Sequence, residues 1–141
     1  MLSRIDPISI ALGEVVTRYI LSSSGYSVAN LRVKPRALEP SPADRCTSVF
    51  RIQSLQENDI WDMGLREVIG TRPQRLHARA DIPVSEILEL KLTIRPHEPP
   101  LRHALIDGWA NEKHTAMATA QELAARVSLK MNPSRNVPIN S

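Results

Sequence analysis

The sequence predicts an α+β fold in which helices pack on one face of a mostly antiparallel sheet of four to five strands. Several segments alternate polar and apolar residues with a period of two, which is typical of strands with one buried face. Other segments repeat apolar residues at helical spacing. The chain has 141 residues, of which 42% are hydrophobic and 23% charged, as in ordinary globular domains. We expect a single domain over residues 1–132 and a flexible C-terminal tail over residues 133–141.

Four helices are predicted from apolar spacing and from helix-end signals. The dipeptide Asp6-Pro7 is a favourable helix start, and the apolar residues after it predict an amphipathic helix as far as Leu21. Three further helices are predicted over residues 54–69 after a capping-box pattern at Ser54 and Glu57, over residues 85–88, and from Asn111 onward.

Alternating segments predict the strands. They lie at residues 47–53, 75–82, 91–97 and 103–107. Residues 30–37 also alternate, but Pro35 cannot donate to a ladder, so an edge strand or an extended arm is expected there. The segments 75–82 and 91–97 alternate in the same phase, with basic residues at every second position. If both strands share a sheet, one face is apolar and the other is basic.

This basic sheet face is the strongest functional signal in the sequence. The planar fork of arginine matches the oxygens of phosphate or carboxylate, and the net charge of +3 agrees with an anionic partner. The candidate nucleic-acid-binding residues are Arg32, Lys34, Arg36, Arg51, Arg75, His77, Arg79, Lys91, Arg95 and Arg102. Aromatic residues are only 4% of the chain, so we expect phosphate contacts with little base readout. The alternative is that these charges form an ordinary solvated face.

The densest group of residues capable of acid–base chemistry lies at positions 95–107. On a strand, His103 and Asp107 share a face, where they could orient one another. A histidine beside arginines suits work on a phosphodiester, so His97, His103 and Asp107 are the candidate catalytic residues. A metal site at this position is the weaker alternative, and we expect neither a metal nor a cofactor.

The absence of common nucleotide, hydrolase and zinc signatures argues against a standard cofactor enzyme. The sequence has no GxGxxG, P-loop, nucleophile elbow, HExxH or paired CxxC pattern. A single cysteine, Cys46, excludes an intrachain disulfide and fits a reducing compartment. No segment reads as a membrane span or a secretory signal. We therefore expect a cytoplasmic protein without membrane contact.

Three functions follow from these observations. The leading one is a small intracellular accessory or binding domain that engages a polyanion, most simply nucleic-acid phosphates, through the basic sheet face. The first alternative is a small phosphodiester-cleaving enzyme that uses histidines and arginines. The second is a protein-interaction subunit of a larger complex. The sequence leaves open the partner, the oligomeric state and whether the protein is an enzyme.

Overall fold

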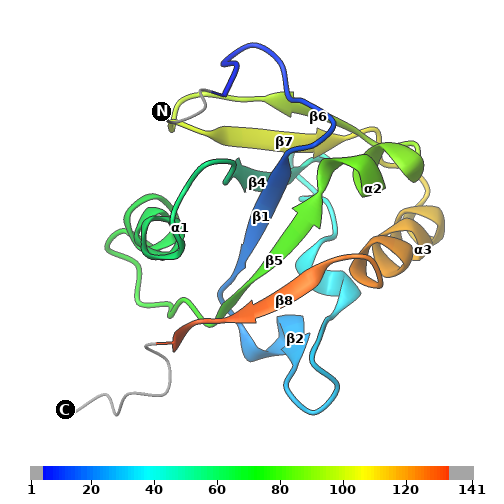
Figure 1. The fold of residues 1–141 in the computed structure, drawn as a ribbon. Helices are drawn as coiled ribbons and strands as arrows, with labels where there is room; N and C mark the ends of the chain where they lie inside the picture. The colour runs from blue at the N-terminus through cyan, green and yellow to red at the C-terminus, as the bar shows by residue number, and fades with distance from the viewer. Residues whose placement is uncertain (1–4, 134–141) are drawn as a thin grey trace.

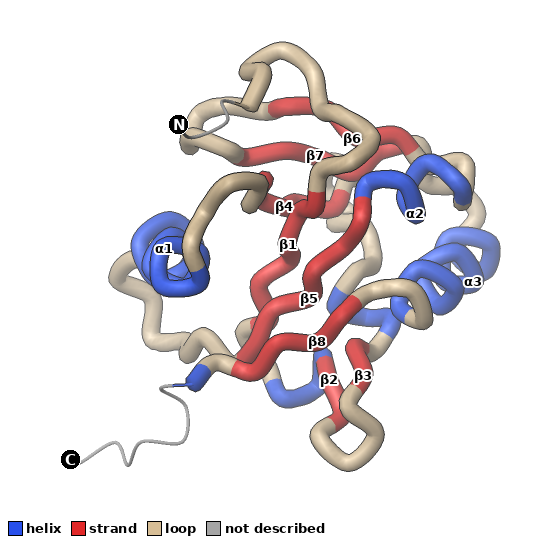
Figure 2. The backbone as a smooth tube through the Cα atoms, in the orientation of Figure 1, coloured by secondary structure: helices blue, strands red, loops and turns tan. Residues whose placement is uncertain are grey.

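A six-stranded antiparallel sheet forms the centre of the molecule (Figures 1 and 2). The structure is a computed structural model and describes residues 5–133. In chain order the strands of this sheet are β1 (Val15–Ile20), β4 (Thr47–Arg51), β5 (Ala78–Pro83), β6 (Thr93–Pro96), β7 (His103–Asp107) and β8 (Ser128–Met131). Their order across the sheet is β6-β7-β4-β1-β5-β8. A second sheet pairs β2 (Tyr26–Ser27) with β3 (Arg32–Val33).

The mostly antiparallel α+β fold is therefore confirmed, but the strand count of four to five was wrong. Strands were correctly predicted at β4, β5, β6 and β7. The main sheet has six strands because β1 and β8 join it next to β5, and neither of these two was predicted. The extended arm at residues 30–37 supplies only β3 and then a short 3-10 turn, Pro35–Ala37.

Helices cover both faces of the sheet, not one. Helix α1 (Glu57–Gly64) lies on one side in Figure 1, and α2 (Val84–Glu89) and α3 (Lys113–Ala124) lie on the other. Trp61 of α1 packs with Tyr19 and Phe50, while Ile87 of α2 and Leu123 of α3 belong to the larger core cluster on the opposite face. The predicted one-sided arrangement was wrong because the supposedly polar face also carries aromatic side chains, which need cover from water.

The predicted helix from Asp6 to Leu21 does not form. Asp6 Oδ1 accepts a hydrogen bond from the Ile8 N–H at 2.9 Å, which closes a turn, and Val15–Ile20 is a strand. Consecutive β-branched residues in this segment favour the strand. The interpretation as an amphipathic helix was wrong because it gave apolar spacing more weight than β-branching.

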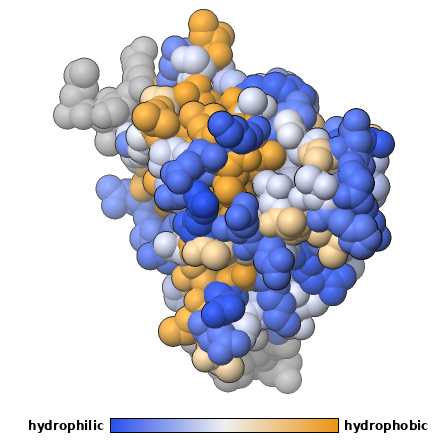
Figure 3. All heavy atoms as spheres, turned by 90° about the vertical axis from the view of Figure 1, so that its right-hand side faces the viewer, coloured by the Kyte–Doolittle hydropathy of each residue, from blue (hydrophilic) through white to orange (hydrophobic). Residues whose placement is uncertain are grey.

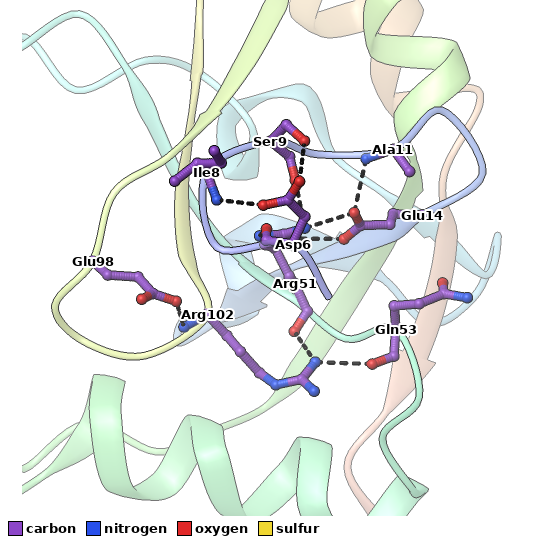
Figure 4. Close-up of polar contacts among 9 residues, drawn as sticks. All are labelled: Asp6, Ile8, Ser9, Ala11, Glu14, Arg51, Gln53, Glu98 and Arg102. Atoms are coloured by element: carbon purple, nitrogen blue, oxygen red, sulfur yellow. Dashed lines mark hydrogen bonds and ion pairs between the residues drawn. The ribbon is translucent and has the colours of Figure 1, made fainter. Parts of the chain in front are cut away.

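A buried ion pair fixes the loop before β1 (Figure 4). Arg51 donates from Nε to Glu14 Oε1 at 2.9 Å and from Nη2 to Glu14 Oε2 at 2.7 Å. The same guanidinium donates to the carbonyl oxygens of Asp6 at 2.6 Å and Ser9 at 2.9 Å. Every donor group of this fully buried arginine is thereby satisfied by the loop, which holds the start of β1 against the end of β4.

Helix ends differ from the capping predictions. Ser54 takes a left-handed φ of 68°, and Gln56 occupies the N-cap of α1 without a side-chain bond, so the capping box does not form. Helix α1 continues as a π-helical turn, Leu65–Ile69. At α3 the capping residue is Glu112, whose carboxylate accepts from the N–H groups of His114 and Thr115, rather than Asn111. Helix α2 agrees with the prediction for residues 85–88.

The main sheet consists of two halves joined by a short ladder. Strand β1 pairs with β5 over six residues, but with β4 only at Val16↔Arg51 and Thr17↔Phe50. Beyond Thr17, β1 and β4 therefore no longer pair. The half β6-β7-β4 and the half β1-β5-β8 separate there, and the candidate site described below lies in that opening.

Two further observations concern the hydrophobic residues: where they lie on one face of the surface, and whether any helix could span a membrane. Figure 3 shows the face that carries α2 and α3, where hydrophobic side chains form an interrupted band with hydrophilic side chains on either side. Within residues 5–133, no helix has the length and apolar character needed to cross a membrane. Apart from its first residue, the predicted tail over residues 133–141 lies outside the described residues, and the single-domain assignment stays a prediction.

The buried ion pair predicts a large stability effect. Glu14→Gln should lower the free energy of unfolding by about 3 kcal/mol, because Arg51 would keep its charge in a buried position without a carboxylate. Glu86→Gln is the matched control, since Glu86 pairs with Arg126 at 3.0 Å with both side chains about one-third exposed, and it should cost less than about 1 kcal/mol. Urea denaturation measures both. Equal costs would show that Arg51–Glu14 does not anchor the loop.

The same pair predicts a loss of stability in acid. Burial raises the pKa of Glu14, but hydrogen bonds from Arg51 and from the Ala11 N–H outweigh it, and the pKa lies below its ordinary value of 4.5. The unfolded chain then takes up the proton first as pH falls. The contribution of Glu14 is complete above pH 4.5 and is lost as pH falls through the lower pKa of the folded protein. Glu14→Gln should reduce this acid sensitivity in urea denaturation at a series of pH values; an unchanged pH profile would contradict it.

Candidate functional site

The predicted basic face is divided by the fold. Arg79 on β5 and Arg95 on β6 do lie on the same face of the sheet as Tyr19 and Leu105, their register neighbours. However, β5 and β6 are four strands apart, or about 19 Å at the usual strand spacing. The buried residues Tyr19 and Leu105 lie between them. These arginines therefore do not form one continuous surface.

All three donor nitrogens of Arg79 are bonded to carboxylates of the protein. Its guanidinium bonds to both carboxylate oxygens of Asp81, at 2.9 and 3.1 Å, and to both of Glu57, at 3.1 and 2.8 Å. It also lies 4.7 Å from the ring centroid of Trp61, in a cation–π contact. With only 1% of its side chain exposed, Arg79 attaches α1 to the sheet and is not available to a phosphate.

Two more candidates serve the scaffold in the same way. Arg51 is fully buried against Glu14. Arg102 donates to the carbonyl oxygens of Arg51 at 3.2 Å and Gln53 at 2.9 Å (Figure 4), which attaches the β6–β7 connection to the segment after β4. Their roles as nucleic-acid ligands stay predictions, but protein oxygens occupy all three donor nitrogens of Arg51 and Nη1 of Arg102.

The remaining basic candidates fall into separate groups and do not form one surface. Arg32 and Lys34 line a cavity beside the end of α3. Arg75 and His77 line another beside the π-helical turn, where His77 Nδ1 is 3.0 Å from the Tyr26 hydroxyl. Lys91 is exposed after α2, and Arg95 Nε lies 3.6 Å from Asp107 Oδ2. Arg36 lines a cavity together with Arg18 and Arg72, as described below.

The structure brings together two of the three candidate catalytic residues. His97 Nδ1 and His103 Nδ1 are 3.2 Å apart. Asp107 shares a strand face with His103 but lies four residues away, about 13 Å at the usual rise per residue, and its partner is Arg95. Among residues 5–133, no three His, Cys, Asp or Glu side chains are grouped so as to hold a metal ion.

A cleft opens where β1 and β4 stop pairing, and we call it the Arg18 cleft. It comprises two adjoining cavities of about 310 and 300 Å³. Both are lined by Arg18, Tyr19, Val68 and Arg72. The first is also lined by Ser48, Phe50, Glu67, Pro100 and His103, and the second also by Ile20, Leu21, Ser22, Ser24, Gly25, Arg36 and Ala37.

Arg18 is the central cation of this cleft. Its Nη1 donates to the Ser48 carbonyl oxygen at 3.0 Å, and its Nε donates to the Ala37 carbonyl oxygen at 3.1 Å. No carboxylate of residues 5–133 forms an ion pair with it. Burial lowers the pKa of Arg18, although an arginine remains charged at neutral pH. Unlike Arg51 and Arg79, this partly buried guanidinium is therefore not neutralised by the scaffold.

The other charges of the cleft are mostly positive. Arg72 and Arg36 are exposed on its walls. Glu67 is the one acidic residue in the described lining of the two cavities, and its carboxylate lies 3.3 Å from Arg66 Nε. Three arginines against one already paired carboxylate give the cleft a positive potential, which favours an anionic ligand.

His103 and Ser48 form a hydrogen-bonded pair in the first cavity. Ser48 Oγ contacts His103 Nε2, and His103 Nδ1 is 2.8 Å from the His97 carbonyl oxygen. The His103 ring also packs edge-on to Phe50 at 5.3 Å between ring centroids. Burial lowers the pKa of His103, and the charge of His97 acts in the same direction, against the hydrogen bond to the His97 carbonyl. A neutral imidazole is thus held between a serine hydroxyl and a carbonyl oxygen.

Sequence reasoning missed Arg18, Arg72 and Ser48. Arg18 lies in the segment that was predicted as a helix, but in a strand it shares its phase with the core residues Val16 and Ile20. A charged residue in the apolar phase of a strand is the signal that identifies it. The sequence holds no equivalent signal for Arg72, which reaches the cleft from the connection after α1.

Comparison of the chain with protein-family models, with curated proteins and with solved structures finds no match. The chemistry of the Arg18 cleft therefore carries the functional argument.

The environment of His103 predicts a neutral imidazole at neutral pH. Its pKa should lie below the ordinary value of 6.5, and Nδ1 should carry the proton, because a carbonyl oxygen can only accept. Long-range ¹H–¹⁵N NMR spectra recorded over a pH series report both properties. A proton on Nε2, or a pKa above 6.5, would contradict the arrangement of Ser48, His103 and the His97 carbonyl.

Proposed function

We propose that the protein is a small binding domain that holds a phosphate-bearing polyanion, most simply a nucleic-acid strand, in the Arg18 cleft. The observation that carries the proposal is Arg18 itself, an arginine fixed by two carbonyl oxygens in a cleft without a carboxylate partner among the described residues. This moves the binding site from the sheet face that the sequence suggests to the opening between β1 and β4.

The Arg18 guanidinium is already oriented before a ligand arrives. Two of its nitrogens are held by backbone oxygens, so binding costs little of the side-chain entropy that a free arginine would lose. Its Nη2 has no hydrogen-bond partner in the described part of the chain, and no buried side-chain nitrogen or oxygen there is left without one. That nitrogen is therefore not completely buried, and we propose that it donates to a phosphate oxygen.

The cleft has room for more than a single ion. Each of its cavities has about ten times the volume of a water molecule in the liquid, which is about 30 Å³. Arg18 and Arg72 line both cavities, and Arg36 lines the second. This distribution of charge fits neighbouring phosphates of a strand better than one isolated phosphate.

Recognition of bases is expected to be weak. The aromatic residues of the lining, Tyr19 and Phe50, are buried and pack against each other at 5.9 Å between ring centroids. Stacking on a base needs an accessible ring face. We therefore propose binding through the phosphate backbone, with steep dependence on salt and little sequence preference.

Cellular setting and assembly also belong to the proposal. Cys46 is unpaired and buried, which agrees with the cytoplasm as the proposed compartment. Roles as an accessory domain, and as a protein-interaction subunit of a larger complex, stay predictions.

The proposal predicts which arginine matters for binding. Arg72→Ala should weaken binding of a labelled single-stranded oligonucleotide of about 12 nucleotides about tenfold and make the salt dependence shallower by about one charge. Fluorescence anisotropy between about 50 and about 200 mM salt measures both quantities. Arg72 is preferred to Arg18 for this test because it is exposed, so its removal leaves the fold intact.

Arg75→Ala is the matched control. It removes the same charge from an exposed position that does not line the Arg18 cleft, and at about 200 mM salt it should leave affinity within about twofold of wild type, because salt screens a charge that makes no direct phosphate contact. Equal losses of affinity in Arg72→Ala and Arg75→Ala would show that the oligonucleotide binds to a diffuse basic surface and not to the Arg18 cleft. Absence of binding at the lowest salt would overturn the proposed function.

A further inference from the structure

We propose that Ser48 is a nucleophile activated by His103, so that the Arg18 cleft cleaves a phosphodiester as well as binding it. This inference rests on the proposed function, because the arginines that would hold the phosphate are the same. It adds a chemical step to the site and assigns that step to Ser48, which lines the first cavity of the cleft.

Ser48, His103 and a backbone oxygen form a continuous hydrogen-bond chain. The Ser48 hydroxyl contacts His103 Nε2, and His103 Nδ1 lies 2.8 Å from the His97 carbonyl oxygen. A carbonyl oxygen can only accept, so Nδ1 donates to it and the other ring nitrogen has a free lone pair. His103 Nε2 is thus the acceptor for the serine proton, which is the relation between a general base and its nucleophile.

The orienting group is a carbonyl rather than the carboxylate suggested by the sequence. Asp107 lies at the far end of β7 beside Arg95, whereas the His97 carbonyl is held in place by the hairpin. The His97 N–H donates to the His103 carbonyl at 2.8 Å, and the His103 N–H donates to the Pro100 carbonyl at 3.1 Å. These two bonds fix the backbone at both ends of the β6–β7 connection, and with it the imidazole.

The cations of the cleft are next to the serine. Arg18 Nη1 donates to the carbonyl oxygen of Ser48 itself at 3.0 Å, so the guanidinium lies beside the residue that would attack. Arg72 lines the same cavity as Ser48 and His103. Charge that develops on the phosphate oxygens in the transition state would be stabilised by these fixed positive groups.

The proposed step balances as follows. Ser48 Oγ attacks the phosphorus, the Oγ proton passes to His103 Nε2, and the bond from phosphorus to the leaving oxygen breaks. The leaving alkoxide departs on the opposite side and takes a proton from water in the open cleft. His103 gives its proton to the hydroxide left by that water and becomes neutral again. A second water molecule, deprotonated by His103, then attacks the phosphorus. Ser48 Oγ leaves with a proton, and the products are an alcohol and a phosphate monoester.

Two probes test the nucleophile in the full chain. An alkyl fluorophosphonate should form a phosphorus ester on Ser48 with loss of fluoride, located by peptide mass mapping. Bis(4-nitrophenyl) phosphate should release nitrophenolate, a leaving group that needs no proton. Ser48→Ala should abolish both reactions, and His103→Gln should slow both by about 10²- to 10⁴-fold, the usual contribution of a general base. Ser85→Ala, which removes an exposed hydroxyl of α2, should change neither.

The outcomes separate this inference from the proposed function. Oligonucleotide binding without labelling or hydrolysis by the wild-type protein would overturn the nucleophile and leave the binding domain. Labelling at another serine, or hydrolysis that persists in a folded Ser48→Ala protein, would also overturn it. Labelling of Ser48 without oligonucleotide binding would support the nucleophile and overturn the proposed function. Thermal melts of each variant establish that the loss does not come from unfolding.

Discussion

The early end of the ladder between β1 and β4 is the constraint on which the rest of the site depends. Two paired positions join the halves of the sheet, and beyond them a β4 carbonyl would lack its ladder donor. Arg18 supplies one by donating to Ser48, and it reaches Ala37 with a second bond. A side chain therefore replaces part of the ladder, and the opening that it bridges becomes the cleft. The same constraint places a cation beside the serine that faces His103.

The buried and partly buried arginines described above fall into two groups: those that pair with a carboxylate and those that do not. Arg51 has Glu14, and Arg79 has both Asp81 and Glu57. In both cases the pair attaches a segment outside the sheet to a strand: the first loop in one case and α1 in the other. Arg18 has only carbonyl oxygens, which orient a guanidinium without neutralising it. The first arrangement supports the fold, and the second leaves charge for a ligand.

Sequence patterns predicted the strands whose alternation is regular, together with α2 and the body of α3. In these elements, burial of one face produces a regular repeat of apolar residues along the chain. They failed at residues 6–21, where the helix start at Asp6-Pro7 and the spacing of the apolar residues predicted a helix. They also placed Arg79 on an open surface, since nothing local shows that Glu57, twenty-two residues earlier, would reach it. The pairing of Ser48 with His103 depends on β4 lying next to β7, which is strand order and cannot be read from periodicity. His97 and His103 were named as candidate catalytic residues because they lie in the densest run of residues capable of acid–base chemistry, and that role stays a prediction.

The central claim is that an anion is held by Arg18 in the opening between β1 and β4. A crystal structure of Ser48→Ala bound to a short single-stranded oligonucleotide tests it most directly, because this variant keeps the arginines and lacks the proposed nucleophile. The account predicts a phosphate within hydrogen-bond distance of Arg18 Nη2 and of Arg72. Phosphates bound instead around Arg75 or Arg95, with the Arg18 cleft containing only water, would contradict it.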